Sequence, residues 1–245
     1  MRWHVDAGAL SILLTTYGMA VASSAIMHML SALRLIGLTL LALVNVLSLS
    51  RVHLRLISRP RPIDYLLLLV NITPYAYVLI KAPLMLMPSI ALFTLFTYEA
   101  LRGRGRGPLA NVAGTVLMAS VYGPWLILLN IPITPNTLYV WFLWMSYHAF
   151  SSTYVEGRLP FRDVKPWAST VVWLTLATPV AYMAYSLGPL HLVPLIEPTV
   201  RAIHAIAEGK IKPSEVRVKL RRVGFGSLAE SLVLASLAIF TAFMG

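Results

Sequence analysis

Four arginines stand within eleven residues of this chain, between two long apolar runs. Arg51, Arg55, Arg59 and Arg61 occupy the stretch "RVHLRLISRPR", and a proline follows each of the last two. A guanidinium group keeps its charge at physiological pH and binds phosphate through paired hydrogen bonds. The stretch therefore predicts a site for an anionic group. The alternative is that these arginines only fix the orientation of the chain in a membrane.

A second group of ionisable residues lies inside an apolar run near the C-terminus. Glu197, Arg201 and His204 are spaced by four and three residues, so they share one face of a helix. Pro194 and Pro198 free backbone carbonyls beside them, as in a helix that lines a cavity. Because charges inside a bilayer are costly, this face is either a ligand site or a self-neutralising ion pair.

Carboxylates are scarce for an enzyme that depends on a metal. Glu230 lies alone about two turns into the last apolar run, and Glu156 and Asp163 share one proline-containing connector. Magnesium prefers clustered carboxylates, so the sequence disfavours Mg²⁺ as a cofactor. The chain has no cysteine, which removes thiolate metal sites and cysteine nucleophiles. The sequence identifies no catalytic residue and leaves open whether the protein is an enzyme.

Two further classes of site are disfavoured by residue spacing. Haem iron takes axial histidines from facing helices. His148 and His204 are the candidate pair, but no spacing in the sequence requires them to meet. Nucleic-acid binding is not expected either, because the basic residues lack interleaved aromatic residues.

The composition predicts a polytopic membrane protein. Hydrophobic residues make up 58% of the 245 residues, charged residues 12%, and the mean hydropathy is +0.76. Soluble domains are about 45–50% apolar and about 25% charged. We therefore expect an all-α bundle in the cell membrane, forming one transmembrane domain over residues 1–245.

Nine membrane spans are predicted from the apolar runs, and eight is the alternative count. They are Asp6–Leu30, Ala32–Leu49, Tyr65–Ile80, Pro83–Ala100, Leu109–Leu129, Pro135–Thr153, Trp167–Leu187, Leu190–Ala207 and Val223–Met244. The third and fourth could instead form a re-entrant pair, and the eighth is interrupted by prolines and charges. Nine spans place 17 of the 20 lysines and arginines on one side. The positive-inside rule then makes that side, with the N-terminus, cytoplasmic.

The order of motifs resembles two membrane families. Asn45 followed by Arg59–Pro60 and Arg61–Pro62 is similar to the region after the second span of UbiA-type intramembrane prenyltransferases, without that family's aspartates. "STYVEGRLPFRD" and "PTVRAIHAI…VKLRRVGFGSLAE" resemble elements of YwiC-like membrane proteins. The matching residues are Tyr154, Val155, Arg158, Pro198, Arg201, Arg222, Gly224 and Glu230.

The resemblance implies a UbiA-like helical bundle with a cytoplasm-facing cavity for an anionic lipidic ligand of the polyprenyl phosphate type. The ligand-binding candidates are Asn45, Arg51, Arg55, Arg59, Arg61, Tyr154, Arg158, Glu197, Arg201 and Glu230. Lipid headgroups and an isoprenoid are the partners expected. Two alternatives remain: a non-catalytic subunit or assembly factor of a respiratory or transport complex, and a small-solute transporter with a midplane charged site.

Overall fold

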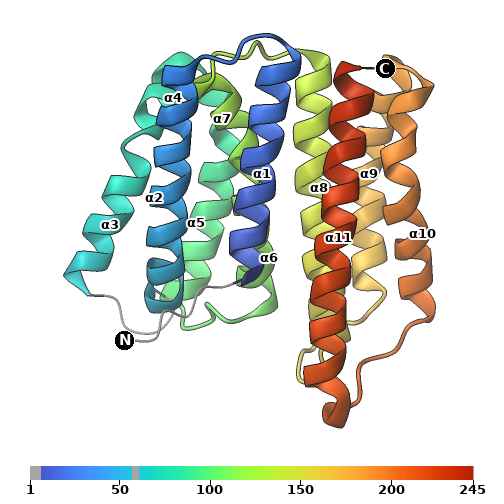
Figure 1. Ribbon diagram of the computed structural model, residues 1–245. Helices are drawn as coiled ribbons and strands as arrows, with labels where there is room; N and C mark the ends of the chain where they lie inside the picture. Colours follow the sequence, from blue (N-terminus) through green and yellow to red (C-terminus); the bar gives the residue numbers. More distant parts are fainter. Residues whose placement is uncertain (1–6, 57–60, 245) are drawn as a thin grey trace. The chain divides into compact units, whose positions relative to one another are not determined.

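The computed structural model describes residues 7–56 and 61–244, and every regular element within them is a helix (Figure 1). The chain divides into two compact units, Met1–Ile133 and Thr134–Gly245. Unit 1 contains α1 (Ala7–Ile26), α2 (Ala32–Leu56), α3 (Pro62–Ile72), α4 (Tyr75–Lys81), α5 (Met87–Leu101), α6 (Pro108–Ser120) and α7 (Tyr122–Leu128), with a 3-10 turn at Pro83–Met85. Unit 2 contains α8 (Pro135–Arg158), α9 (Ala168–Leu187), α10 (Val193–Ala207) and α11 (Val216–Phe243), with 3-10 turns at Pro189–Leu192 and Pro213–Glu215.

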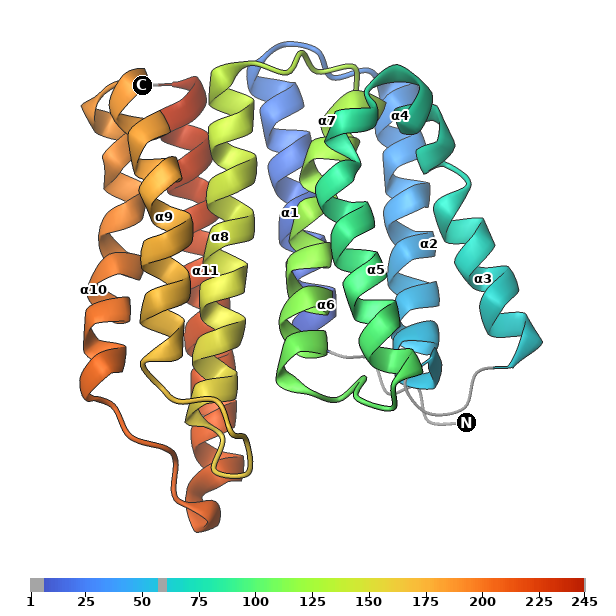
Figure 2. The same ribbon diagram turned by 180° about the vertical axis from the view of Figure 1, so that it is seen from behind.

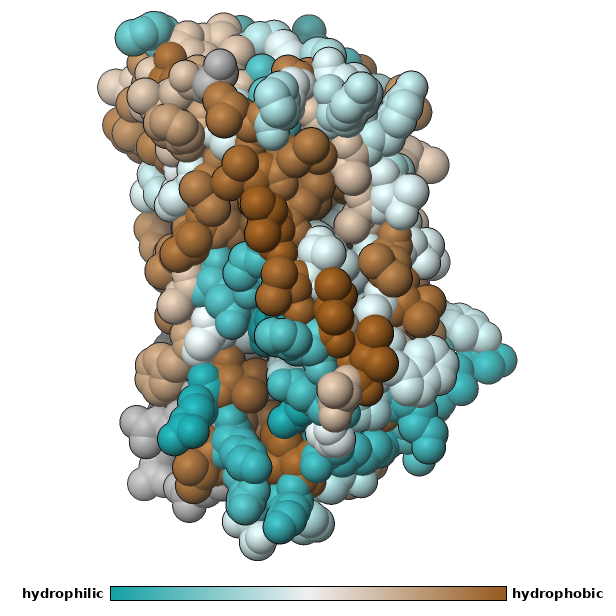
Figure 3. Space-filling model, turned by 90° about the vertical axis from the view of Figure 1, so that its right-hand side faces the viewer, coloured by the Kyte–Doolittle hydropathy of each residue, from teal (hydrophilic) through white to brown (hydrophobic). Residues whose placement is uncertain are grey.

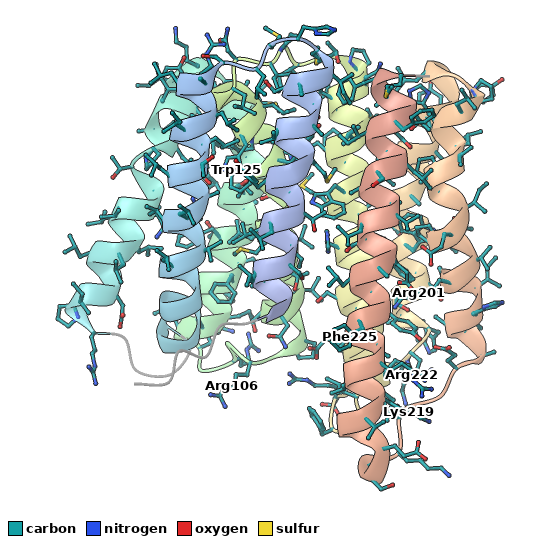
Figure 4. The ribbon with its side chains drawn as sticks, in the orientation of Figure 1. Arg106, Trp125, Arg201, Lys219, Arg222 and Phe225 are labelled. Carbon is teal, nitrogen blue, oxygen red and sulfur yellow. The ribbon has the colours of Figure 1, made fainter. Side chains whose placement is uncertain are left out.

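Neutral hydrogen bonds between side chains hold unit 1 together. α1 packs against α2, α6 and α7, and α5 packs along α6. The Nε1–H of Trp125, marked in Figure 4, donates to the Tyr75 hydroxyl at 3.0 Å, and that hydroxyl donates to Asn45 Oδ1 at 3.5 Å. The hydroxyls of Ser23 and Tyr122 lie 2.8 Å apart. Because Trp125 and Tyr122 are fully buried, these bonds satisfy polar atoms that no water reaches.

Proline interrupts unit 1 at two places where the sequence predicts continuous spans. Between α3 and α4 the chain bends by 42° at Thr73 and Pro74. α6 ends at Ser120, four residues before Pro124, whose ring nitrogen has no hydrogen to donate to the Ser120 carbonyl. Each predicted span of unit 1 beyond the second therefore consists of more than one helix or turn.

α8 is the central helix of unit 2, and Figure 2 shows it beside α9 from behind. Its start is fixed by Thr134 and Thr137, whose side chains each accept a hydrogen bond from the other's backbone N–H. Sixteen of its 24 residues are buried, so it packs on nearly every side. α9 and α11 make most of its contacts. The aromatic residues Trp141, Trp144, Tyr147 and Phe150 fill the core around it.

Several helices have the length and apolar character of membrane spans. Four qualify within the described residues: Gly8–Ile26, Pro108–Leu128, Ala168–Leu187 and Val218–Phe243, and the bent pair Pro62–Ile72 with Tyr75–Lys81 makes up to five. Ala32–Leu47 and Met87–Leu101 are shorter apolar helices. Each of the nine predicted spans coincides with a helix or with a pair of consecutive helices or turns. The protein is therefore a helical bundle rich in apolar helices, as expected for a membrane protein.

Basic residues gather at one end of each unit. In unit 1, Arg61 and the connector with Arg102, Arg104 and Arg106 lie at the end where α2 and α5 finish. In unit 2 the connectors after α8 and α10 bring their basic residues to one end, where Figure 4 marks Lys219 and Arg222. Figure 3 shows one side of unit 2, with apolar residues over much of the surface and hydrophilic residues gathered lower in the view.

Candidate functional site

The last turn of α8 carries the first half of a charged cluster in unit 2. Tyr154 is buried, and its hydroxyl donates a hydrogen bond of 2.5 Å to Oε2 of Glu208. The same oxygen accepts a bond of 2.6 Å from Nη1 of Arg158, the last residue of α8. A phenol and a guanidinium therefore converge on one carboxylate oxygen, which is also how such groups bind an oxygen of an anionic ligand.

Arg201 on α10 carries the second half of the cluster. Its Nη1 forms an ion pair with Oε2 of Glu230 on α11, and its Nη2 donates to the Ser227 hydroxyl at 3.3 Å. The guanidinium carbon also lies 4.5 Å from the centre of the Tyr154 ring and 5.8 Å from that of Phe150. A cation at these distances is attracted by the negative face of an aromatic ring. Arg201 thus joins α8, α10 and α11 (Figure 4).

We call Tyr154, Arg158, Arg201, Glu208 and Glu230 the arginine cluster. The ring of Tyr154 is its centre, because the Arg158 guanidinium carbon lies 5.8 Å from the ring centre as well. Two arginines and two glutamates cancel in formal charge. The arginine side chains are mostly buried, at 17% and 14% exposed, whereas Glu208 and Glu230 are 37% and 31% exposed. The acidic members are therefore the ones that solvent or a ligand can reach.

Two connectors hold Glu208 in place. The backbone N–H of Ile211, after α10, donates to the Arg158 carbonyl at 2.9 Å, and Lys210 Nζ donates to the Arg162 carbonyl. The connector after α8 folds back closely on Gly157, where an added Cβ would stand 3.0 Å from the Lys165 carbonyl oxygen. A glycine is needed at this close approach, because a side chain there would displace backbone.

Glu156 and Asp163, which share this connector, do not form a carboxylate pair. Glu156 is buried and its Oε2 lies 2.8 Å from Nε of Arg162, whereas Asp163 is exposed. Asp64 instead accepts a hydrogen bond of 2.8 Å from the backbone N–H of Arg61 and caps α3. Among the residues that the structure describes, no group of three or more histidine, aspartate or glutamate residues is placed to hold a metal ion.

The structure brings four of the predicted site residues together. Tyr154, Arg158, Arg201 and Glu230 all belong to the arginine cluster. Arg201 forms its ion pair with Glu230 on α11 and not with Glu197 on its own helix. Glu197 and His204 are both exposed, one turn before and about one turn after Arg201.

The predicted residues of unit 1 lie apart from one another or outside the described part. Asn45 is buried and donates to the Leu41 carbonyl at 2.7 Å. Asn45 accepts a hydrogen bond from Tyr75, which follows Arg61 by 14 residues. This separation corresponds to about 20 Å of largely helical chain, so Asn45 and the exposed Arg61 are not adjacent. Arg59 lies outside the described residues, as do the side chains of Arg51 and Arg55. A phosphate site at these arginines stays a prediction.

The sequence reading missed Glu208, Ser227 and Phe150. Glu208 follows α10 in the connector "EGKIKP", and nothing in the surrounding sequence marks it as the partner of Arg158. Ser227 is three residues before Glu230, so one face of α11 presents both to Arg201. Phe150 precedes Tyr154 by four residues and places a second ring on the same face of α8.

Two buried histidines have no visible role in the cluster. His148 packs edge-on against Trp144, with ring centres 4.2 Å apart. His191 packs edge-on against Tyr139 at 5.4 Å, and the Tyr139 hydroxyl donates to the His191 carbonyl. His148 is buried on α8, whereas His204 is exposed on α10.

Comparison with protein-family models, with curated proteins and with solved structures gave no match to this chain.

Proposed function

We propose that this protein is a multi-pass membrane protein that binds an anionic lipidic ligand at the arginine cluster of unit 2. The observation that carries the proposal is the shared oxygen of Glu208, on which the Tyr154 hydroxyl and the Arg158 guanidinium converge. A phosphate oxygen of the ligand takes the place of that carboxylate oxygen. The resemblance to UbiA-type proteins suggests a polyprenyl phosphate as the ligand class.

The surroundings of the cluster suit a ligand with an apolar tail. On α10, the aliphatic side chains of Val200, Ile203 and Ile206 are 48%, 57% and 60% exposed. These side chains lie on the side of α10 away from Arg201, so they give the helix an apolar outer surface along which the hydrocarbon chain of a ligand can lie. Glu208 is partly exposed and belongs to a connector, so it can leave Arg158 and Tyr154 without disturbing a helix.

The arrangement of helices supports nine spans as the topology of this protein. The helices and helix pairs coincide with nine apolar runs, and the basic residues gather at one end of each unit. Nine crossings place those ends on the same, cytoplasmic side of the cell membrane by the positive-inside rule. The arginine cluster then lies near the cytoplasmic surface, where a lipid phosphate lies. We assign no catalytic residue.

Binding of farnesyl phosphate, compared with farnesol, tests the proposal. We expect native mass spectrometry of the detergent-purified full chain to show at least tenfold tighter binding of the phosphate. Arg158→Gln should weaken phosphate binding about tenfold or more, because hydrogen bonds to charged groups contribute about 1.5–3 kcal/mol. Glu208→Gln should strengthen it, because the competing carboxylate is removed.

Arg106→Gln is the matched control, since Arg106 is an exposed arginine of unit 1. It should leave binding unchanged. The double variant Arg201→Gln with Glu230→Gln removes the second arginine without leaving its partner unpaired, and should also weaken phosphate binding. Equal affinity for farnesyl phosphate and farnesol, or unchanged binding in Arg158→Gln and the double variant, would contradict the proposal.

A role as a non-catalytic subunit or assembly factor is the second candidate. Five carboxylates of the described residues, those of Glu99, Glu156, Glu208, Glu215 and Glu230, form ion pairs within the chain. Carboxylates held in ion pairs are typical of groups that stabilise a structure, which favours this candidate. Copurification of a larger membrane complex with the tagged chain at constant stoichiometry would favour this candidate, and a stable isolated monomer with bound lipid would favour the first.

A further inference from the structure

Unit 1 contains a cavity that the arginine cluster does not involve. It measures about 430 Å³ and lies between α2, the break between α3 and α4, and the end of α7. Leu38 and Leu41 are buried at its floor, and Leu40 and Val70 are exposed at its rim. Pockets that hold small ligands have about this volume and are mostly apolar, with few polar groups.

The absence of a side chain at Gly37 opens the cavity. Gly37 is exposed and lines the cavity, and a Cβ added there would meet no atom within 4 Å, so a side chain at this position would extend into open space. Pro74, at the bend between α3 and α4, lines the opposite wall. A single hydrocarbon chain fits this shape, because the lining side chains other than that of Arg34 are aliphatic.

Arg34 is the charged residue that lines the cavity. It belongs to the first turn of α2, and its Nη1 donates to the Leu129 carbonyl at 3.4 Å. The Arg34 side chain makes this one hydrogen bond to the described residues. A guanidinium has five N–H donors, so several remain for a ligand at the mouth of the cavity.

The end of unit 1 with Arg34 is poor in charge. Lys81, at the end of α4, is the other lysine or arginine among the described residues there, and neither it nor His28 lines the cavity. Electrostatic attraction at this end therefore depends mainly on Arg34, unlike the opposite end, where the connectors are basic.

We infer that this cavity binds one hydrocarbon chain of an anionic phospholipid, with the lipid phosphate at Arg34. An apolar cavity with a cation at one end is complementary to a molecule with one anionic end and an apolar remainder. The exposed side chains of Leu40 and Val70 at the rim give a chain from the surrounding bilayer a way in. The lipid comes from the membrane leaflet opposite the basic connectors. This inference does not depend on the proposed function of unit 2.

Native mass spectrometry with two lipids that differ only in the headgroup tests the inference. The detergent-purified full chain is titrated with dioleoyl phosphatidylglycerol and with dioleoyl phosphatidylcholine. We expect phosphatidylglycerol to bind about tenfold more tightly, and Arg34→Gln to reduce it to the level of phosphatidylcholine. Gly37→Leu should weaken both lipids, because the added side chain enters the open space.

Lys81→Gln is the matched control, a cation at the same end but outside the cavity, and should change nothing. Arg158→Gln should also leave this binding unchanged, which separates it from the cluster of unit 2. Inorganic phosphate should not displace the lipid, because the chain supplies part of the affinity. A phosphatidylglycerol analogue with a diazirine in its chain should crosslink to residues 34–44 or 70–74 in the unaltered protein. Equal affinity for the two lipids, an unchanged Arg34→Gln, or crosslinks elsewhere alone would overturn the inference.

Discussion

The two units solve the problem of buried polar groups in different ways. In the middle of unit 1, Trp125, Tyr75 and Asn45 form a chain of neutral hydrogen bonds, and a buried carboxylate of this unit, Glu99, pairs with the exposed Arg104 just after the end of α5. Unit 2 uses charges, because Arg201 and Glu230 pair between α10 and α11. A neutral hydrogen bond contributes about 1 kcal/mol, whereas a buried ion that loses its partner costs several times as much.

This difference separates a scaffold from a site that can change state. The chain of bonds in unit 1 has no charge to exchange with a ligand. In unit 2, Glu208 holds two donors that an anion could take over. The comparison predicts that unit 2 responds strongly to the loss of one charge and little to the loss of a whole pair, and that unit 1 responds to the loss of single hydroxyl groups.

Arg201→Gln should cause the largest loss of stability. It leaves Glu230 without its cation and Tyr154 without the guanidinium over its ring, and we expect the free energy of unfolding to fall by about 2–3 kcal/mol. Unfolding in mixed detergent–SDS micelles measures this. Adding Glu230→Gln should restore more than half of the loss. If the double variant is no more stable than the single one, the pair does not act as a unit.

Tyr75→Phe should have a smaller effect, on unit 1. It removes the hydroxyl that accepts from Trp125, so a buried indole N–H loses its partner and the free energy of unfolding should fall by about 1–2 kcal/mol. Tyr77→Phe is the control, because Tyr77 lies on the same helix and is 49% exposed. The same unfolding measurement should show no change for it. Equal losses for both variants would argue against the hydrogen-bond chain.

Lys219→Gln should have the smallest effect, although it also breaks an ion pair of unit 2. Lys219 and Glu215 are both exposed and four residues apart, with N and O at 2.6 Å. Exposed pairs of this kind contribute about 0.3–0.5 kcal/mol and are screened by salt. The free energy of unfolding of Lys219→Gln should be lower than that of the unaltered protein by no more than this amount at low salt, and the difference should shrink at high salt. If Lys219→Gln lowers the free energy of unfolding as much as Arg201→Gln, burial does not explain why the two ion pairs differ.

The apolar runs predicted where helices lie but not where they begin, end or break. The sixth span, predicted to end at Thr153, continues as α8 to Arg158, and the ninth, predicted from Val223, begins as α11 at Val216. Hydropathy follows the apolar part of a helix, and polar residues such as Arg158 and Lys219 continue a helix readily beyond it. The bend at Pro74 was missed for a related reason, since a single proline hardly changes the hydropathy of its run.

The members of the arginine cluster differ in how far sequence could predict them. Arg201 and Glu230 interrupt apolar runs, and an ion inside such a run is a signal by itself. Glu208 gives no such signal, because its contact with Arg158 depends on how two connectors meet. The sequence did not show which carboxylate pairs with Arg201 either. Glu197 is the nearer acid in sequence, but the ion pair forms with Glu230 on α11.

On the topology that we propose, the length of α11 would set the depth of the cluster in the bilayer. The helix has 28 residues, about 42 Å at 1.5 Å per residue, whereas a hydrocarbon core of about 30 Å needs roughly 20 residues. Counted back from Phe243, that core begins near Gly224, so residues 216–223 project into the headgroup layer and beyond it. Glu230 then lies about 9 Å below the boundary, within reach of an arginine that extends toward water. On this topology α11, the longest helix among the described residues, would hold the cluster just beneath the polar surface of the bilayer.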